Sequence, residues 1–449
     1  MSSDFANFVR PERGNSGPRG SRGILKAKTT ETRPGDYTER GCSFLGCRVV
    51  VCGQVKNVVH LVHSPIGCAY YSWDYRVDSK GYCFTTDLDE FDVIFGGEKK
   101  LYSAIEMAVR EFKPDAVFVY QTCTTGLIGD DIKAIADKAS REFGVPVLAF
   151  ECAGFRGLTQ NTGHKIASET LFRLIEGRGN GCHKAGEGDR NRINLIGDFN
   201  LKDAKELERV FESLGFEVIC TFTANATVDR IKRMGEANLN VVQCSKSSIF
   251  IARLMEERFG IPYVEANFFG LENTAKSFRE IAEYFPGAAR RVEEYIEESE
   301  RRLKPQLDFY REKLEGRSVF ISHGVQRAIY WIKPFEELGM RIAGVSTYFG
   351  SQEEIEKIRT LTKAKVFDNP SLDEFEEILL STMPDLVVSD DKLRHLCHKI
   401  AIPFLNGRGQ NKAYSGFNGF MTFARDVYET LNSRIWMLAR RDPNCLASS

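Results

Sequence analysis

The sequence predicts an α/β protein made of three Rossmann-like domains with mainly parallel sheets. From about Val49 onward, short β-branched runs alternate with amphipathic stretches. This alternation is typical of parallel strands joined by helices that cover both faces of a sheet. The chain has 449 residues, which at about 150 residues per domain allows two to four domains. Two internal boundaries favour three.

The expected strands are short β-branched runs. Examples are Asp115–Tyr120, Arg192–Gly197, Glu217–Thr223, Ser318–Ser322, Arg341–Ser346 and Asp385–Ser389. The expected helices are the amphipathic stretches Lys202–Leu214, Ser247–Phe259 and Gln352–Leu361. Ligands in such folds sit where loops leave the carboxyl ends of strands. Four residues of interest follow expected strands: Cys123 after DAVFVY, Cys244 after the NVV run, and His323 with Arg327 after SVFIS.

Two segments indicate boundaries between domains. Residues 177–190 are polar and glycine-rich, and Ala288–Leu314 is a highly charged helical connector. The first 40 residues are basic and rich in Gly, Pro and Ser, without the apolar periodicity of a folded segment. They are expected to form an extended N-terminal arm, either a solvated tail or an arm over a partner subunit. The expected units are the arm at 1–40 and three α/β domains at 41–190, 191–315 and 316–449, the last with the C-terminal helices.

Composition argues against several classes of partner. With 61 basic and 62 acidic residues, the chain has no overall field to attract nucleic acid. No window approaches about 18 consecutive apolar residues, so no membrane span is expected. A chain of this length without an apolar leader at Met1 is expected to be soluble and cytoplasmic, where thiols stay reduced. Its 12 cysteines therefore do not indicate the disulfide framework of a small secreted domain.

Three cysteines lie in glycine-containing turns next to apolar runs. Cys42 occurs in RGCSFLGC, Cys68 in HSPIGCAYYSW and Cys123 in YQTCTTGLIGDD, and a fourth, Cys244, ends NLNVVQC. A glycine before Cys42 and Cys68 lets the backbone approach a bulky inorganic group and offer N–H donors to sulfides. The pattern indicates iron–sulfur chemistry, whereas a buried structural thiol is the alternative for any one of these cysteines.

Several motifs resemble the α-type subunit of nitrogenase component 1. The similar segments, in order, are HLVHSPIGCAYYSWDYR, CFTTDLDEFDVIFGGEKKL, TCTTGLIGDD, NLNVVQCSKSS, GIPYVEANFFG and SGFNGFMTFARD. They run from about Arg40 to about Trp436. The chain is therefore identified as a member of this superfamily, and the resemblance implies metalloclusters at domain and subunit interfaces.

The resemblance assigns the four cysteines to two clusters. Cys42, Cys68 and Cys123 match the three thiolates that an α-type subunit gives to the shared P-cluster, an [8Fe-7S] group, or to a smaller [4Fe-4S] centre in some relatives. A β-type (K/N-like) subunit would supply the remaining ligands in an α₂β₂ heterotetramer. Cys244 matches the thiolate that holds the terminal iron of the large iron–sulfur cofactor, whose heterometal stays open. Thiolates are soft donors that suit such clusters.

One departure concerns the far metal of the large cofactor, which nitrogenases hold through a histidine shortly after an Ile-Pro-Phe-like segment. Here IPFLNGRGQNKAYSGF contains no histidine, and Arg408 lies near that position by register. Arginine is a permanent cation and cannot bind a metal. His395 and His398, just upstream in LRHLCHKI, are interpreted as ordinary helix residues. The second ligand of the cofactor is therefore left open.

The candidate catalytic residues are Gln160, His164, Val50 and Arg76. Gln160 and His164 match the glutamine and histidine on the active face of catalytic nitrogenases, and His164 is the candidate proton donor because imidazole titrates near neutral pH. Val50 matches a small apolar residue near the substrate, with an ordinary core valine as the alternative. Three basic residues match those around the cofactor and its organic acid: Arg76, Arg327 and Lys392. An anionic cluster needs such cations, whereas surface salt bridges are the alternative.

Other titratable residues are assigned to structure. His60 and His63 are expected to hydrogen-bond to backbone at a strand end, and Asp130–Asp131 to cap a helix start. Most of the remaining cysteines are expected to be buried apolar residues: Cys47, Cys52, Cys83, Cys152, Cys182, Cys220, Cys397 and Cys445. GGEKK and GFRG are not phosphate-binding loops, so ATP would be used by a separate partner, the dimeric [4Fe-4S] iron protein.

Two classes of function follow, one enzymatic and one not. The first is the catalytic α-type subunit of a nitrogenase-like reductase acting on a small molecule. Its best-fitting subgroup is methylthio-alkane reductase, which cleaves C–S bonds, and dinitrogen reduction is the alternative within the class. The second is a scaffold on which a nitrogenase cofactor matures, which the missing histidine favours and Gln160 with His164 disfavours. A tetrapyrrole reductase of the same superfamily would leave Cys244 unexplained.

Overall fold

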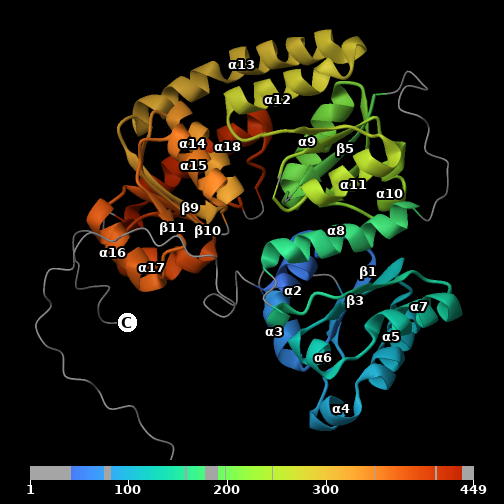
Figure 1. Cartoon of the computed structure of the whole chain (residues 1–449). Coiled ribbons are helices and arrows are strands. Elements are labelled where there is room, and N and C mark those ends of the chain that lie inside the picture. The colour runs from blue at the N-terminus through green and yellow to red at the C-terminus, as the bar shows by residue number, and fades with distance from the viewer. Residues whose placement is uncertain are drawn as a thin grey trace, which may run out of the picture.

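The computed structural model describes residues 42–74, 82–156, 159–176, 191–197, 199–244, 246–348, 350–409 and 412–436. Three parallel sheets organise them, and helices pack around each sheet (Figure 1). Several features expected from the sequence lie outside the described residues: the N-terminal arm, the polar segment 177–190, Arg76, Cys182 and Cys445.

The first sheet has the strand order β2-β1-β3-β4, with all neighbours parallel. Its strands are β1 (Val58–His63), β2 (Tyr82–Thr85), β3 (Ala116–Gln121) and β4 (Val147–Phe150). The surrounding helices are α2 (Ser43–Leu45), η1 (Gly46–Cys52), α3 (Ile66–Asp74), α4 (Glu90–Phe95), α5 (Glu98–Phe112), α6 (Cys123–Ile128), α7 (Ile132–Phe143), η3 (Gly154–Arg156) and α8 (Gln160–Glu176). Every residue of β1 and β3 is buried, as expected for strands covered on both faces.

The second sheet has the order β6-β5-β7-β8, again all parallel. Its strands are β5 (Asn191–Gly197), β6 (Phe216–Thr223), β7 (Leu239–Val242) and β8 (Tyr263–Glu265). The helices that follow them are α9 (Leu201–Ser213), α10 (Val228–Lys232), η4 (Met234–Glu236), α11 (Ile249–Phe259), α12 (Leu271–Glu283) and α13 (Pro286–Leu314). Although α13 spans 29 residues, no helix in the described ranges combines the length and apolar character needed to cross a bilayer.

The third sheet has the order β11-β10-β9-β12-β13 and is also parallel throughout. Its strands are β9 (Ser318–Gly324), β10 (Arg341–Tyr348), β11 (Val366–Asp368), β12 (Leu386–Ser389) and β13 (Phe404–Asn406). Its helices are α14 (Val325–Glu337), α15 (Gln352–Leu361), α16 (Leu372–Thr382), η5 (Asp391–Leu393), α17 (Arg394–Lys399) and α18 (Gly416–Leu431). The central position of β9 places its carboxyl end in the middle of this layer.

The predicted α/β class with parallel sheets is confirmed. The six expected strands are β3, β5, β6, β9, β10 and β12, and the expected helices are α9, α11, α15 and the charged connector α13. The strands that were not predicted are mostly short, such as β8 and β13 with 3 residues each, because a run of that length carries no clear alternation. β1 is longer, but two histidines interrupt its apolar run VVHLVH.

Packing joins neighbouring sheets. One buried cluster combines Tyr120 of the first sheet with Phe222 of the second, and α8 lies between these two sheets (Figure 1). A second cluster combines Phe278 on α12 with Trp331 on α14 and Phe423 on α18. The layers therefore share cores, and loops from all three can meet at one site. The exact domain limits stay a prediction.

Candidate functional site

A cavity open to solvent, of about 920 Å³ when the solvent space at its mouth is included, lies where the second and third sheets face η1 and α8. Its wall combines η1, the first turns of α8, the loop after β7, the end of β9 with the start of α14, and the turn after β13. Carboxyl ends of parallel strands are the usual place for ligands in such folds. Residues from these elements that line the cavity include Val50, Gln160, His164, Cys244, His323, Arg327 and Arg408.

Two glycines bring η1 against α8. A Cβ built on Gly46 would overlap the carbonyl oxygen of Gln160, and one on Gly163 would overlap the carbonyl oxygen of Ser43. Because neither glycine carries a side chain, the two helices approach closely enough to place Val50 and His164 in the same wall. η1 is a π-helical segment of 7 residues, a rare form that occurs often at functional sites.

Cys244 lies just after β7, with its side chain partly exposed in the cavity wall. The Ser247 N–H donates to the Cys244 sulfur at 3.5 Å, and the Ser248 N–H donates to its carbonyl oxygen at 3.1 Å. A turn of this kind holds the thiol in one place and offers an N–H donor to a bound thiolate. Tyr330 supports the same loop, because its hydroxyl donates to the carbonyl oxygen of Gln243.

The three basic residues expected near the cofactor have different positions. Arg327 lines the cavity, where its guanidinium donates to the Gly407 carbonyl at 3.4 Å and lies over the Phe269 ring. Lys392 does not line the cavity but follows Asp390, whose carboxylate accepts a hydrogen bond from Tyr348 at 2.8 Å. Arg76 lies outside the described residues. Of the two expected basic residues that the structure describes, Arg327 lies in the cavity wall and Lys392 does not.

Cys42, Cys68 and Cys123 come together beside the first sheet, from the start of α2, from α3 and from the start of α6. A Cβ built on Gly154 would lie 3.5 Å from the Cys42 sulfur and 3.8 Å from the Cys123 sulfur. Both cysteines are also close enough to Cys68 for their charges to affect its pKa. All three side chains are partly exposed. Folding thus gathers three thiols that are far apart in the sequence.

Burial makes the thiols of Cys42 and Cys68 hard to ionise in the absence of a cation. It raises the pKa of Cys68 to about 11, with the charges of Cys42 and Cys123 adding to the effect. Burial likewise raises the pKa of Cys42. Metals bind thiolates rather than thiols, so a metal group at this site would displace the protons.

Three thiols brought to one place are soft donors of the kind that iron–sulfur clusters use. Within the ranges that the structure describes, no three His, Cys, Asp or Glu side chains are placed to hold a single ion. An iron–sulfur cluster spreads its thiolates apart, because each one binds a different iron. Gly154 leaves space beside two of the sulfurs, and a Cβ on Gly67 would meet nothing within 4 Å.

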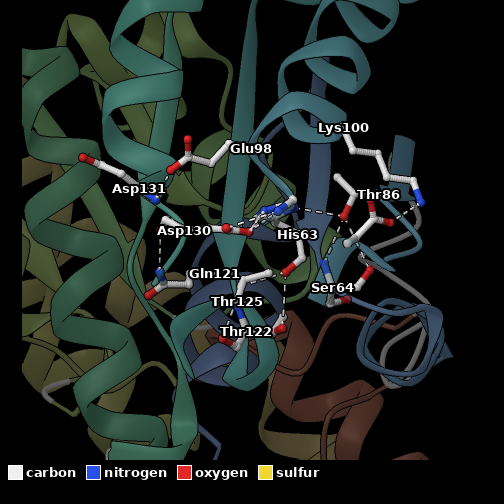
Figure 2. A network of polar contacts seen from close by, with 12 residues as sticks. His63, Ser64, Thr86, Glu98, Lys100, Gln121, Thr122, Thr125, Asp130 and Asp131 are labelled. Carbon is white, nitrogen blue, oxygen red and sulfur yellow. Dashed lines mark hydrogen bonds and ion pairs between the residues drawn. The ribbon is translucent and has the colours of Figure 1, made fainter. Parts of the chain in front are cut away.

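Figure 2 shows the polar network that holds the Cys123 loop. His63 Nε2 lies 2.9 Å from Asp130 Oδ2. The His63 carbonyl oxygen accepts hydrogen bonds from the hydroxyls of Thr122 and Thr125, at 3.3 and 3.0 Å. Since these threonines flank Cys123, the network fixes the position of that thiol relative to β1.

The structural role expected for the two histidines of β1 is confirmed, but the expected backbone partners are wrong. His60 Nδ1 lies 2.8 Å from the Tyr120 hydroxyl, and His63 Nδ1 lies 3.0 Å from the Thr86 hydroxyl. Both histidines are buried between strands. A side-chain partner is needed there because the backbone groups of β1 are engaged in pairing with β2 and β3.

Only one of the two adjacent aspartates caps a helix. Asp131 caps α7 by accepting from the Ala134 N–H at 2.9 Å, as predicted. Asp130 instead turns inward, where its carboxylate oxygens each lie 3.2 Å from the Gly97 N–H. The prediction that both residues form the cap is therefore wrong for Asp130, which links β1 to the start of α5.

The residues interpreted as structural have the expected exposure. Among the described cysteines without an assigned role, five are buried and Cys83 is partly exposed; the buried ones are Cys47, Cys52, Cys152, Cys220 and Cys397. His395 and His398 are exposed on α17, away from the cavity wall. The expected burial of most of these cysteines and the helical position of the two histidines are confirmed.

Several residues of the cavity wall were not predicted from the sequence. They include Asn161, Lys246, Phe269, Tyr330 and Tyr348. Lys246 and Tyr348 could have been found by their position at a strand end, as Cys244 was, because Lys246 follows β7 and Tyr348 ends β10. Phe269 and Tyr330 carry no such signal, since the packing of α12 and α14 brings them to the cavity.

Comparison with known proteins identifies the family. Residues 42–432 match the family described as Nitrogenase component 1 type Oxidoreductase. The nitrogenase molybdenum-iron protein alpha chain of Methanothermobacter marburgensis is 38% identical over 439 residues, covering 93% of this chain and 92% of that protein. The nitrogenase iron-molybdenum cofactor biosynthesis protein NifE of Methanosarcina barkeri is 35% identical over 425 residues, covering 91% of each. A solved structure, Nitrogenase Cp1 at pH 6.5, matches with a TM-score of 0.79 and 29% identity, covering 92% of this chain and 94% of that one. The chain therefore belongs to the nitrogenase component 1 family of oxidoreductases, as an alpha-type subunit.

Proposed function

We propose that this chain is the catalytic α-type subunit of a nitrogenase-like reductase that cleaves the C–S bond of methylthio-alkanes. In this reaction the thioether takes up two electrons and two protons. The C–S bond breaks, one proton ends on carbon to give the alkane, and the other ends on sulfur to give methanethiol. The observation that carries the proposal is the single cavity that contains Gln160, His164 and Cys244.

The cavity wall fits a large anionic iron–sulfur cofactor. Cys244 supplies one thiol, the Ser247 N–H points at its sulfur, and the cations Arg327 and Arg408 line the same space. Soft sulfur donors bind iron, and cations with N–H donors stabilise the negative charge of sulfides. When bound, such a cofactor supplies stored electrons for a multi-electron reduction. Its heterometal and its organic acid stay open.

His164 and Gln160 are proposed to act on the substrate. Both come from the first turns of α8, and His164 is 7% exposed. A buried imidazole near a reacting sulfur can deliver a proton to the leaving thiolate, and the glutamine amide can hold the substrate by a hydrogen bond. Val50 adds an apolar surface beside them, which suits the alkyl groups of a thioether.

Electrons are proposed to enter through a cluster at Cys42, Cys68 and Cys123, shared with a β-type subunit in an α₂β₂ heterotetramer. A dimeric iron protein would use ATP and deliver these electrons. Exposed apolar side chains lie on α3 and α6, which carry Cys68 and Cys123, on η3 beside the thiols, and on α4, which packs against α6: Ile66, Tyr70, Phe91, Ile94, Phe95, Leu127 and Phe155. A patch of this kind marks an interaction surface, which supports a partner subunit here.

Two alternatives remain in the same family. A scaffold for cofactor assembly is supported by the similarity to NifE proteins and by Arg408 in the cavity wall, since a cofactor held mainly by Cys244 can leave. Dinitrogen reduction is supported by the similarity to nitrogenase molybdenum-iron protein alpha chains. Gln160 and His164 favour a catalytic role over a scaffold.

The deciding experiment uses the purified complex of this chain with its β-type partner. The complex receives its iron protein, ATP and a reductant, and is given ethyl methyl sulfide or dinitrogen in parallel. Ethane and methanethiol with little ammonia would support C–S cleavage, whereas ammonia as the main product would establish the dinitrogen alternative. No product from either substrate, together with transfer of the cofactor to an apo-enzyme, would overturn the catalytic proposal in favour of the scaffold.

A further inference from the structure

His323 is a second imidazole in the cavity wall and belongs to a different sheet from the one that precedes Cys244. It lies near the carboxyl end of β9, the central strand of the third sheet, and is 1% exposed. Cys244 follows β7 of the second sheet. A thiol and an imidazole therefore enter the same cavity from two sheets, on rigid strand ends rather than on long loops.

The turn after β13 has a glycine that makes room for this imidazole. A Cβ built on Gly407 would overlap His323 Nε2 and would lie 3.0 Å from Val388 Cγ1. The His323 ring thus packs directly against the Gly407 backbone, next to Arg408 in the cavity wall. The guanidinium of Arg327 donates to the Gly407 carbonyl at 3.4 Å, so the turn is also tied to α14.

The chemistry of the wall assigns different roles to these groups. Arginine keeps its proton and cannot bind a metal, so Arg408 can only stabilise negative charge. A neutral imidazole is a good ligand for iron, and together with a thiolate it forms a donor set that iron–sulfur groups use. His164 lies on a third element, α8, and its proposed role is with the substrate. His323 is the imidazole of the wall that lies beside the Gly407–Arg408 turn.

We propose that His323 is the second protein ligand of the cluster held by Cys244, bound through an imidazole nitrogen from the third-sheet side of the cavity. The proposal rests on the cofactor part of the proposed function and holds for an enzyme or a scaffold. It accounts for Gly407, because a side chain there would push the ring out of position. The step is ligand exchange, in which His323 as the neutral base replaces a weaker ligand and no electron is transferred.

The test is pulsed EPR of the purified complex, in a paramagnetic state, with histidine carrying ¹⁵N in the imidazole ring. A directly bound imidazole gives a nitrogen coupling, which we expect in the unmodified complex, in the exposed control His395→Asn, and in His164→Gln. The coupling should vanish in His323→Asn and weaken in Gly407→Ala. Absence of coupling in the unmodified complex, or its persistence in His323→Asn, would overturn the proposal.

A second variant covers the case in which His323→Asn holds no iron. His323→Gly with added ¹⁵N-imidazole should regain iron and show the coupling, because the free base can occupy the vacated space. Iron content without coupling, or failure of imidazole to restore either, would count against ligation. Turnover of ethyl methyl sulfide is measured separately. Nitrogen coupling without turnover would reject the proposed reaction and support His323 as a ligand. Turnover without nitrogen coupling would support the reaction and reject His323 as a ligand.

Discussion

His63 Nε2 and Asp130 Oδ2 lie 2.9 Å apart, with side chains that are 0% and 4% exposed. The pair joins the end of β1 to the turn before α7, and the His63 carbonyl oxygen accepts hydrogen bonds from the threonines on both sides of Cys123 (Figure 2). The buried pair therefore holds His63 in place, and the His63 carbonyl in turn positions the two threonines next to Cys123. This relationship leads to the first prediction.

Asp130→Ala should lower the free energy of unfolding by about 3 kcal/mol, because it leaves His63 and the Gly97 N–H without their buried acceptor. It should also lower the iron content associated with Cys123. The neighbouring Asp131→Ala removes only the exposed cap of α7 and should cost about 1 kcal/mol with iron unchanged. Denaturant unfolding and iron analysis check both variants, and equal effects would contradict this role of Asp130.

Stability should fall as the pH drops below about 6.5, the ordinary pKa of histidine. Burial, aided by the Arg48 charge, holds the pKa of His60 well below that value, and burial also lowers the pKa of His63. Both are therefore neutral in the folded chain, whereas the unfolded chain takes up protons below pH 6.5. The stabilisation is complete above that pH and is lost as the pH falls toward the folded pKa values.

The measurement for this pH dependence is the melting temperature between about pH 5 and pH 8. His60→Gln should flatten the acid side of the curve, because one group with a lowered pKa is removed. His395→Gln, on the exposed face of α17, serves as the control and should leave the shape unchanged. An unaltered curve for His60→Gln would show that another group causes the loss.

Gly163→Ala should destabilise the chain by about 2 kcal/mol or more, because the new methyl group overlaps the Ser43 carbonyl oxygen and the backbone must move. It should also displace α8 from η1 and so disturb the cavity at His164. Gly287→Ala on α13 is the matched control, since a Cβ there would meet nothing within 4 Å. The control should be neutral or up to about 1 kcal/mol stabilising, as measured by denaturant unfolding.

Cys68→Ala and Cys244→Ala should each remove a different group of iron atoms. The two thiols lie on different layers, one beside the first sheet and one after β7, so the loss of one cluster should leave the spectrum of the other intact. Cys397→Ala is the control, because burial raises the pKa of that thiol to about 12 and no metal role is assigned to it. Iron analysis and EPR check these outcomes, and a single variant that empties both sites would contradict the assignment.

His164→Gln should lower turnover by about 10²–10⁴-fold, the usual contribution of a general acid, while iron content changes little. The variant keeps a hydrogen-bonding side chain but cannot donate a proton in the same way. Turnover of ethyl methyl sulfide with the iron protein measures the effect. A rate close to that of the unmodified complex would remove His164 from proton transfer.

Much of the architecture could be read from local patterns. The runs that became β3, β5, β9 and β12 have the β-branched residues of buried parallel strands, and α13 has the charge pattern of an exposed connector. Cys244 and His323 could be recognised as strand-end residues for the same reason. Short strands such as β8 could not be predicted, since 3 residues give too little periodicity to separate a strand from a loop.

The arrangement of the site depends on contacts between distant segments. Asp130 and Asp131 look alike in the sequence, yet one is buried against His63 and the other caps α7. No local pattern could place His323 against Gly407, because that contact arises only when β9 and β13 join one sheet. Residue types and their spacing determined the elements and the candidate donors, whereas the packing of three sheets determined which donors share a cavity. The physical reason is that periodicity reports burial along one element, while a site requires close approach between several.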